Sequence, residues 1–319
     1  MKSFDVVVVG AGPAGTSAAL LLARCCRRVL VVDEGRPRNA VTRAVHGFLT
    51  RDGIAPGELR RLARRELRGY GVEIQNARVL GAERVDEGFR VRIGGRRHRT
   101  VKCRRLLLAT GLEDRLPDLP GLREQYGVRV HHCPYCDAYE HRGRRLAAYG
   151  KGAAVAALAR RLANWSEDVL VCATGRLGPG VRAGLEARGI TVEPRRLLRL
   201  EGTSRTLRLV FERGAPLVRD AMFVAAPHSA ASALAVRLGS LADRTGCLLT
   251  GRDQSTRSPG LYAAGDATRG PQFAIGAAAE GTLAAWAINE DLLAEDARES
   301  SRPSNTAGRD SKSASIRRT

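Results

Sequence analysis

An α/β fold with two Rossmann-like nucleotide-binding units is predicted by two segments of strand, glycine-rich turn, helix and second strand. The first segment begins at Phe4 and the second at Leu146. A further apolar strand, residues 106–111, ends in the small-residue turn Ala-Thr-Gly. Continuous apolar runs of this kind are typical of parallel strands buried on both faces. The length of 319 residues is sufficient for two domains of ordinary size.

The N-terminal unit contains the parts of a dinucleotide-binding site in order. They are a strand, a GxGxxG turn, a helix, a second strand and an acidic pair: 4–9, 10–15, 16–26, 29–32 and 33–34. The first glycine makes the tight turn, the second admits a pyrophosphate, and the third lets the helix pack on the strand. The helix N-terminus faces the phosphates, and the acid reaches a ribose hydroxyl. The predicted contacts are Gly10, Gly12, Pro13, Ala14, Gly15, and Asp33 with Glu34 as its alternative. A glycine-rich turn without a ligand is the competing interpretation.

The next segments are less diagnostic. Residues 35–52 read as an irregular polar loop close to the bound nucleotide, with Arg38 and Asn39 as contacts. Residues 55–70 form an amphipathic, arginine-rich helix with an apolar face. Partial alternation over 72–93 indicates short antiparallel strands, and the prolines of 114–121 indicate a linker.

Between the two nucleotide-type units, residues 131–137 read His-His-Cys-Pro-Tyr-Cys-Asp. Two intervening residues let the sulfurs of Cys133 and Cys136 bond at the start of a helix, where free N–H groups and the helix dipole stabilise a thiolate. His132, as an imidazolium, would lower the thiol pKa further, and Asp137 could move a proton to or from a thiol. The stretch therefore predicts a redox-active dithiol with these four residues as its catalytic group.

Three alternatives to the redox dithiol stay open. A structural zinc needs four ligands, and the nearest other cysteines, Cys103 and Cys172, are distant in sequence. An inert buried pair has the same spacing. Pro-Tyr between two cysteines also occurs in glutaredoxins, but there the motif lies near the N-terminus of a small domain.

The second nucleotide-type unit departs from the fingerprint. Its turn, 150–155, places Val155 where a small residue normally lets the helix pack closely. The following strand, 168–173, ends without an acid for a ribose hydroxyl and without an arginine cluster for a phosphate. Either a nicotinamide site or a retained fold with a degraded site is compatible with this pattern.

The C-terminal part contains another strand, 260–264, which ends at Gly265 and Asp266. Asp266 could accept a hydrogen bond from a ribitol hydroxyl, and the N-terminus of the following small-residue helix could face the pyrimidine end of a flavin. An ordinary strand-to-helix turn is the alternative. Further predicted elements are strands within 192–224 and a helix over 230–239.

Composition excludes some classes of protein. The net charge of +20 comes from 53 basic against 33 acidic residues, but only four of the basic residues are lysines and no nucleic-acid-binding motif accompanies them. Biased codon usage explains such a charge, and an acidic protein partner is the functional alternative. Seven cysteines at irregular spacing do not form a secreted disulfide framework. The sequence has no 18-residue apolar run and no signal-peptide pattern, so we expect a cytoplasmic protein that is not membrane-bound. We also expect no bound metal.

Together the motifs resemble the low-molecular-weight thioredoxin reductases, over nearly the whole chain to about residue 295. The resemblance implies a homodimer in which a second nucleotide-binding-like domain is inserted into an FAD-binding domain. The expected division is 1–112 with 245–297 for FAD, 113–244 for the NAD(P)-binding-like domain with the cysteine pair, and 298–319 as a disordered tail. It implies that Cys136 faces the flavin, Cys133 attacks the substrate and Asp137 donates a proton. Further expected FAD contacts are Thr110, Gly111, Gly265, Asp266, Gln272, Phe273 and Ala274.

The run 46–53 is similar to the dithiol-oxidase branch of that family, which closes disulfides in metabolites such as gliotoxin and holomycin. The branch implies that His46 lies near FAD and that electrons pass from a substrate dithiol through the cysteine pair and FAD to oxygen. The expected partner is a dithiol or disulfide, either a small molecule or a thioredoxin-like protein. The alternatives are an NADPH- or ferredoxin-dependent thioredoxin reductase, and a basic binding protein without redox turnover.

Overall fold

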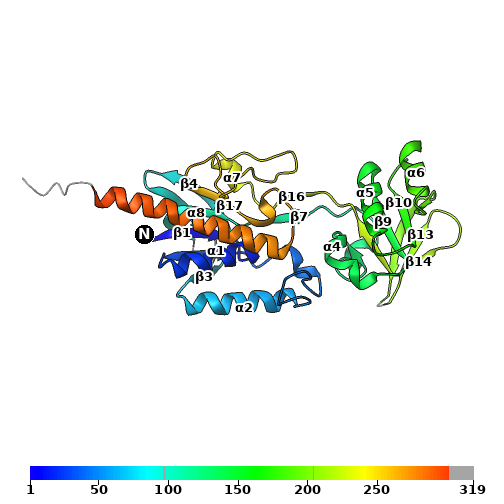
Figure 1. Ribbon diagram of the computed structural model, residues 1–319, viewed down its shortest axis with the longest axis horizontal. Coiled ribbons are helices and arrows are strands. Elements are labelled where there is room, and N and C mark those ends of the chain that lie inside the picture. The colour runs from blue at the N-terminus through cyan, green and yellow to red at the C-terminus, as the bar shows by residue number, and fades with distance from the viewer. Residues whose placement is uncertain (96–97, 204, 302–319) are drawn as a thin grey trace, which may run out of the picture.

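The computed structural model describes residues 1–95, 98–203 and 205–301. Two lobes are joined by a narrow pair of strands, and the first lobe holds both the N-terminal strands and the long C-terminal helix (Figure 1). The second lobe is built entirely from residues between these two parts of the first. The predicted insertion of one nucleotide-binding-like unit into another is therefore confirmed.

The first lobe is built on a seven-stranded sheet of order β3-β2-β1-β6-β5-β4, with β17 paired to β6. Its strands are β1 (Lys2–Val9), β2 (Val29–Asp33), β3 (Glu73–Asn76), β4 (Val79–Val85), β5 (Gly88–Ile93), β6 (Arg99–Leu108) and β17 (Leu261–Ala263). The hairpin of β4 and β5 is antiparallel, as predicted. Strand β3, predicted as antiparallel, instead pairs in parallel with β2, because the helix between them returns the chain in the same direction.

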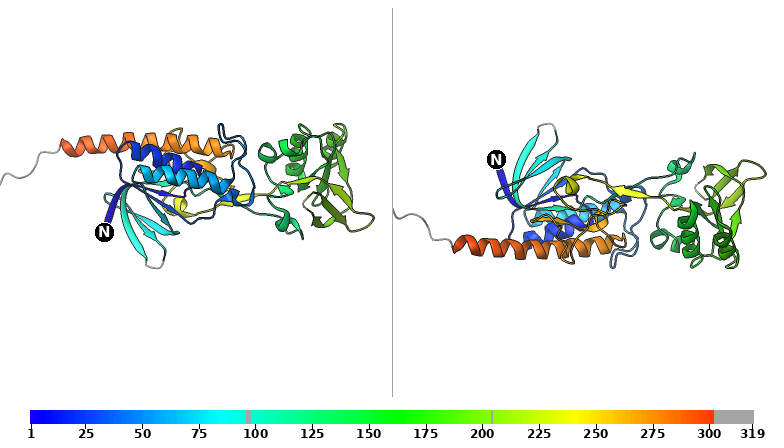
Figure 2. Two further views of the ribbon diagram at one scale, coloured as in Figure 1. Left: turned by 90° about the horizontal axis from the view of Figure 1, so that it is seen from below. Right: turned by 90° about the horizontal axis from the view of Figure 1, so that it is seen from above.

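Three helices cover one face of this sheet: α1 (Pro13–Arg24), α2 (Pro56–Gly69) and α8 (Ala274–Ser300). Apolar side chains of β1, β2, α1 and α8 form a single core cluster there. Helix α8 runs along the lobe and extends beyond it (Figure 2). It includes residues 298–300, which we expected to begin the tail, and the rest of the predicted tail from 302 to 319 lies outside the described residues.

The second lobe has a parallel sheet of order β11-β10-β9-β15-β8. Its strands are β8 (Val130–His131), β9 (Leu146–Gly150), β10 (Val169–Ala173), β11 (Thr191–Glu193) and β15 (Ala221–Val224). Core clusters lie on both faces. One forms with helices α5 (Gly152–Leu162) and α6 (Pro179–Glu186), and the other with the antiparallel strands β12 (Leu197–Gly202), β13 (Leu207–Phe211) and β14 (Leu217–Arg219).

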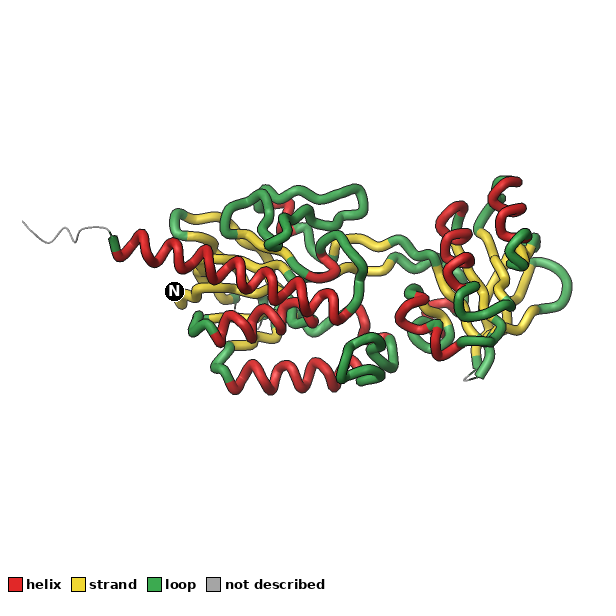
Figure 3. The backbone as a smooth tube through the Cα atoms, in the orientation of Figure 1, coloured by secondary structure: helices red, strands yellow, loops and turns green. Residues whose placement is uncertain are grey.

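The strands that join the lobes are β7 (Leu112–Asp114) and β16 (His228–Ala230), which pair in antiparallel fashion (Figure 3). The helix predicted over 230–239 is shorter, since Ala230 belongs to β16 and α7 spans only Leu234–Arg237. Leu234 of α7 packs in the core of the first lobe. We therefore propose that the second domain boundary lies at β16 rather than at residue 244.

Short elements carry the remaining loops near the junction. They are α3 (Leu122–Gln125), α4 (Pro134–Asp137), η1 (Arg38–Val41), η2 (Tyr139–His141) and η3 (Gly265–Ala267). Helix α4 follows β8 directly and faces the first lobe (Figure 1). Within the described ranges, none of the helices has the length and apolar content needed to cross a bilayer.

Candidate active site

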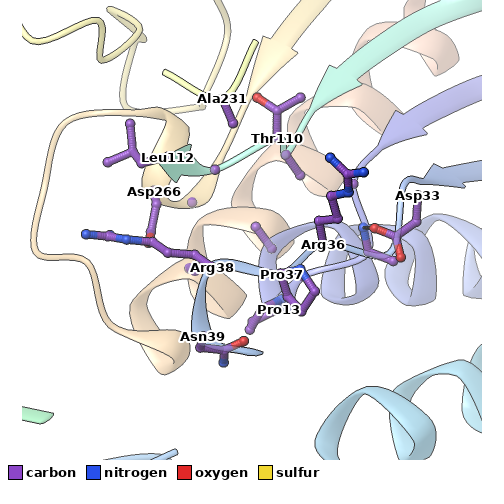
Figure 4. A pocket seen from close by; sticks show the side chains of 18 of the residues that line it. Pro13, Asp33, Arg36, Pro37, Arg38, Asn39, Thr110, Leu112, Ala231 and Asp266 are labelled. Atoms are coloured by element: carbon purple, nitrogen blue, oxygen red, sulfur yellow. Dashed lines mark hydrogen bonds and ion pairs between the residues drawn. The ribbon is translucent and has the colours of Figure 1, made fainter. Parts of the chain in front are cut away.

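A cavity of about 710 Å³ opens at the edge of the first sheet where the carboxyl ends of its parallel strands meet. This is where open α/β sheets bind ligands, and the volume suits a cofactor. Asp33 lies at one end of the cavity and Arg38 lies with Asp266 at the other (Figure 4). The predicted nucleotide contacts that line it are Gly10, Gly12, Pro13, Ala14, Asp33, Glu34, Arg38, Asn39, His46, Thr110, Gly111, Gly265, Asp266, Gln272, Phe273 and Ala274.

The glycine turn has the shape of a phosphate cradle. A Cβ on Gly10, whose φ is +106°, would lie 2.2 Å from the carbonyl oxygen of Ala109. A Cβ on Gly15 would lie 1.9 Å from the carbonyl oxygen of Gly10, so Gly15 lies beneath the turn and not at the cavity wall. A Cβ on Gly12 would meet no protein atom within 4 Å. The turn thus fits a diphosphate next to the N-terminus of α1.

Asp33, at the end of β2, accepts hydrogen bonds from groups that were not predicted from the sequence. Its Oδ1 accepts a hydrogen bond from the Ala11 N–H at 3.2 Å. Its Oδ2 accepts hydrogen bonds from Arg60 at 2.8 Å and Arg64 at 2.6 Å. A carboxylate offers about four acceptor positions, so capacity remains for a ribose hydroxyl. Arg60 and Arg64 lie one helical turn apart on α2. This spacing was the feature of the sequence from which a shared acidic partner could have been predicted.

At the other end of the cavity, Arg38 connects several acidic and amide groups. Its Nε and Nη2 donate to the two carboxylate oxygens of Asp114 at 3.0 and 2.5 Å. Its Nη1 donates to Asp266 at 3.0 Å and to Gln272 at 2.5 Å. Arg38 was predicted only as a cofactor contact, and Asp114 was assigned to a linker. The ion pairs lie at the junction of the two lobes.

Cys133 and Cys136 form a disulfide across the first turn of α4. Cys136 and Asp137 line the same cavity as the glycine turn, whereas Cys133 is half-buried and is not among the lining residues. In this state neither sulfur is a thiolate able to bind zinc. The fold therefore brings the second cysteine, not the first, to the wall of the candidate nucleotide site.

His132 also lines the cavity, and its ring Nδ1 lies 2.7 Å from the hydroxyl oxygen of Tyr126. The Tyr126 hydroxyl donates a hydrogen bond to Asp114 at 3.0 Å. Burial lowers the pKa of His132, and the charge of Asp114 only partly opposes this. His132 is therefore neutral near pH 7. This direction runs against the predicted imidazolium, because desolvation disfavours the charged ring, and the effect of His132 on the thiol pKa stays a prediction.

A family model described as pyridine nucleotide-disulphide oxidoreductase matches residues 4–281. The chain belongs to this family. The oxidoreductase is 31% identical over 279 residues to thioredoxin reductase tcpT of Claviceps purpurea, an alignment that covers 82% of the chain and 86% of tcpT. It is 36% identical over 157 residues to a probable thioredoxin reductase of Arthroderma benhamiae, which covers 46% of the chain but only 38% of that relative.

Solved structures agree with this assignment. The crystal structure of HlmI superimposes with a TM-score of 0.87 at 36% identity and covers 93% of this chain and 95% of HlmI. A putative thioredoxin reductase TrxB from Bacillus anthracis gives a TM-score of 0.85 at 30% identity over 92% and 99% of the two chains. The protein is thus a thioredoxin reductase-like oxidoreductase. Its family implies a flavin and a nicotinamide nucleotide as cofactors.

Behind the cysteine pair, the oxidoreductase buries two further histidines. The ring centroids of His131 and His141 are 5.3 Å apart. The Nδ1 of His131 is 3.4 Å from a carboxylate oxygen of Asp137. Both nitrogens of His131 and Nδ1 of His141 are buried without a hydrogen-bond partner among the described residues. Burial, and then the charge of His131, lowers the pKa of His141 from 6.5 to about 4.

This lowered pKa predicts a loss of stability in acid. Unfolded His141 takes up a proton below about pH 6.5, whereas the folded protein resists protonation until about pH 4, so stability falls as the pH decreases across that window. Between pH 7 and pH 5, the melting temperature of His141→Val should decrease by roughly 2–4 °C less than that of the wild type. His98→Val, at an exposed histidine, is the control. An unchanged slope in His141→Val would contradict the assignment.

Side chains from both lobes meet around the cysteine pair. His46 of the first lobe lies 3.6 Å from Glu140 of the second and 3.6 Å from Asp52. Tyr135, between the two cysteines, is exposed and contacts Phe273 of the first lobe edge-on, with ring centroids 6.0 Å apart. The two lobes of the oxidoreductase therefore contact each other next to the cysteine pair through aromatic and ionisable side chains.

Proposed function

We propose that this oxidoreductase is an FAD-dependent dithiol oxidase that forms a disulfide in a small-molecule or protein dithiol through Cys133 and Cys136. One observation carries the proposal. Cys136 lines the same cavity as the glycine turn and Asp266, so a dinucleotide held by the turn would extend toward the redox-active sulfur. The half-buried Cys133 is left for the substrate.

The residues of the cavity suit the parts of FAD. The turn 10–14 would hold the diphosphate at the start of α1, and Asp33 would accept a ribose hydroxyl. Asp266 would hold the ribitol, and the start of α8 at residues 272–274 would face the ring. When bound, FAD would supply an acceptor for the electron pair of the reduced cysteines and would transfer it to oxygen.

The cysteine chemistry can be written from this chain's own residues. A base takes the proton of a substrate thiol, and the resulting thiolate attacks Sγ of Cys133. The Cys133–Cys136 bond breaks, a mixed disulfide forms and Cys136 leaves as a thiolate. The second substrate sulfur, after losing its proton, attacks the first and releases Cys133. The substrate has then lost two electrons and two protons, and the cysteine pair has gained the electrons. Neutral His132 and Asp137 at the cavity wall are the candidate proton carriers.

Two features favour an oxidase over a nicotinamide-dependent reductase. Val155 stands at the third position of the second fingerprint, where its fully buried side chain occupies the contact between α5 and β9. Strand β10 ends at Ala173 and is followed by Thr174, Gly175 and Arg176, with no acid for a ribose hydroxyl. The alternative function is an NADPH- or ferredoxin-dependent thioredoxin reductase.

Oxygen uptake with a small dithiol and no nicotinamide tests this function directly. We expect steady oxygen consumption, with substrate disulfide formed in equal amount to the peroxide released. In the absence of air, the dithiol should bleach the flavin absorbance and one equivalent of NADPH should not. The reverse pattern, bleaching by NADPH and no turnover of dithiols at wild-type FAD content, would favour the reductase.

We further propose that the enzyme acts in the cytoplasm as a homodimer. Both statements rest on the resemblance to thioredoxin reductases. Light scattering coupled to size-exclusion chromatography measures the assembly state, and a mass near 34.3 kDa, the mass of a single chain, would contradict the dimer.

A further inference from the structure

Four side chains form a hydrogen-bonded chain that joins two residues of the cavity wall, Arg38 and His132, and His132 directly precedes Cys133 in the sequence. Arg38 binds both carboxylate oxygens of Asp114, the Tyr126 hydroxyl donates to Asp114, and the same hydroxyl lies 2.7 Å from Nδ1 of His132. We propose that Asp114 and Tyr126 are positioning residues that fix the proton of His132 on Nδ1 and leave Nε2 as the basic nitrogen of the active site. The proposal rests on the proposed function where it assigns a task to Nε2.

The direction of the chain follows from the number of protons available. Burial would raise the pKa of Asp114, but the hydrogen bonds and charge of Arg38 overcome this and lower it, so the carboxylate is ionised and only accepts. Burial and the neighbouring charge of Asp114 raise the pKa of Tyr126, which keeps its proton. That single proton is donated to Asp114. The hydroxyl oxygen must then accept from Nδ1–H of His132, which leaves the lone pair on Nε2.

The chain crosses the junction between the lobes. Arg38 lies in η1 of the first lobe, Asp114 in the joining strand β7, and Tyr126 and His132 in the second lobe. The side chains of Arg38 and Asp114 are 14% and 8% exposed, so water competes little for these bonds. The charged or titratable groups that act on His132 are Asp114, Arg38, Asp137 and His131, with Tyr126 as its direct partner.

This arrangement gives His132 a defined task in the reaction. Nε2 takes the proton of a substrate thiol, and the thiolate then attacks Cys133 as described above. The imidazolium that forms keeps Nδ1–H on Tyr126, and the negative charge of Asp114 stabilises it through the hydroxyl. Without the Tyr126 hydroxyl, the proton of neutral His132 can occupy either nitrogen, and the fraction of molecules with a basic Nε2 falls.

Nitrogen-15 NMR of the imidazole rings tests the proton position without any turnover. In the wild type, the His132 signals, assigned by their loss in His132→Gln, should show a protonated Nδ1 and an unprotonated Nε2. Tyr126→Phe keeps the ring and removes the hydroxyl, so its His132 spectrum should shift toward a mixture of tautomers. Tyr139→Phe, the same change at an exposed tyrosine, should leave the spectrum unchanged. An unprotonated Nδ1 in the wild type would overturn the proposal.

Kinetics test whether Tyr126 acts through His132. We expect Tyr126→Phe to lower kcat with a small dithiol about tenfold with little change in KM. In a His132→Gln background the same change should have no further effect, because residues acting as a unit are not additive. An equal loss in both backgrounds would mean a merely structural tyrosine. If the wild type turned over no dithiol, the proposed function would fail while the NMR result still decided the proton position.

Discussion

Cys136→Ser should abolish dithiol oxidation, with a loss of about a thousandfold or more in kcat, while the protein stays yellow. The serine hydroxyl cannot form the disulfide that a substrate thiolate must attack, and it cannot leave as a stable anion. FAD retention is expected because the proposed nucleotide contacts are the glycine turn, Asp33 and the start of α8, which line the cavity and are unchanged in this variant. Oxygen uptake and the absorbance spectrum of the purified variant measure both properties.

Cys133→Ser should lose turnover to the same extent, because the disulfide again cannot form. Cys136 would remain at the cavity wall as a free thiol, but no disulfide would be available for the substrate thiolate to attack. Cys25→Ser is the matched control, because Cys25 is an exposed free cysteine in the first lobe. Substantial turnover by either motif variant would remove the cysteine pair from the mechanism.

Gly12→Val should produce a folded protein that binds FAD at least about tenfold more weakly, a change of 1.4 kcal/mol. A Cβ at this position meets no protein atom within 4 Å, so the fold should tolerate the side chain. The same side chain would occupy the space through which a diphosphate approaches the backbone. Circular dichroism reports the fold, and the ratio of flavin to protein absorbance reports the cofactor.

Two comparisons separate this effect from damage to the fold. Gly57→Val, at a helix position where a Cβ also meets nothing within 4 Å, should leave FAD content unchanged. Gly15→Ala should lower the melting temperature as well as FAD content, because its Cβ would collide with the carbonyl oxygen of Gly10 at 1.9 Å. Normal FAD affinity in Gly12→Val would mean that the nucleotide does not bind at this turn.

The local motifs could be predicted from the sequence because each one depends on the conformation of a few adjacent residues. Gly10 has a φ of +106°, and Gly15 lies against the backbone of the turn. Both positions therefore require glycine, which the sequence shows directly within a strand–turn–helix pattern. The spacing of Cys133 and Cys136 likewise determines that both sulfurs meet in one helical turn. Residues 4–9 and 29–32 were identified by their continuous apolar character.

Partners separated widely along the chain were decided only by the tertiary structure. Asp114 reads as part of a linker, and its role arises because β7 pairs with β16 and brings the carboxylate to Arg38, 76 residues away. Tyr126 carries no motif, and its hydroxyl acquires a function only between Asp114 and His132. Burial lowers the pKa of His132, and a sequence does not display burial. The sequence by itself determined the turn, the cysteine pair and the family, because these depend on neighbours along the chain. The direction of the hydrogen bonds, and with it the position of the catalytic proton, depends on how the two lobes meet.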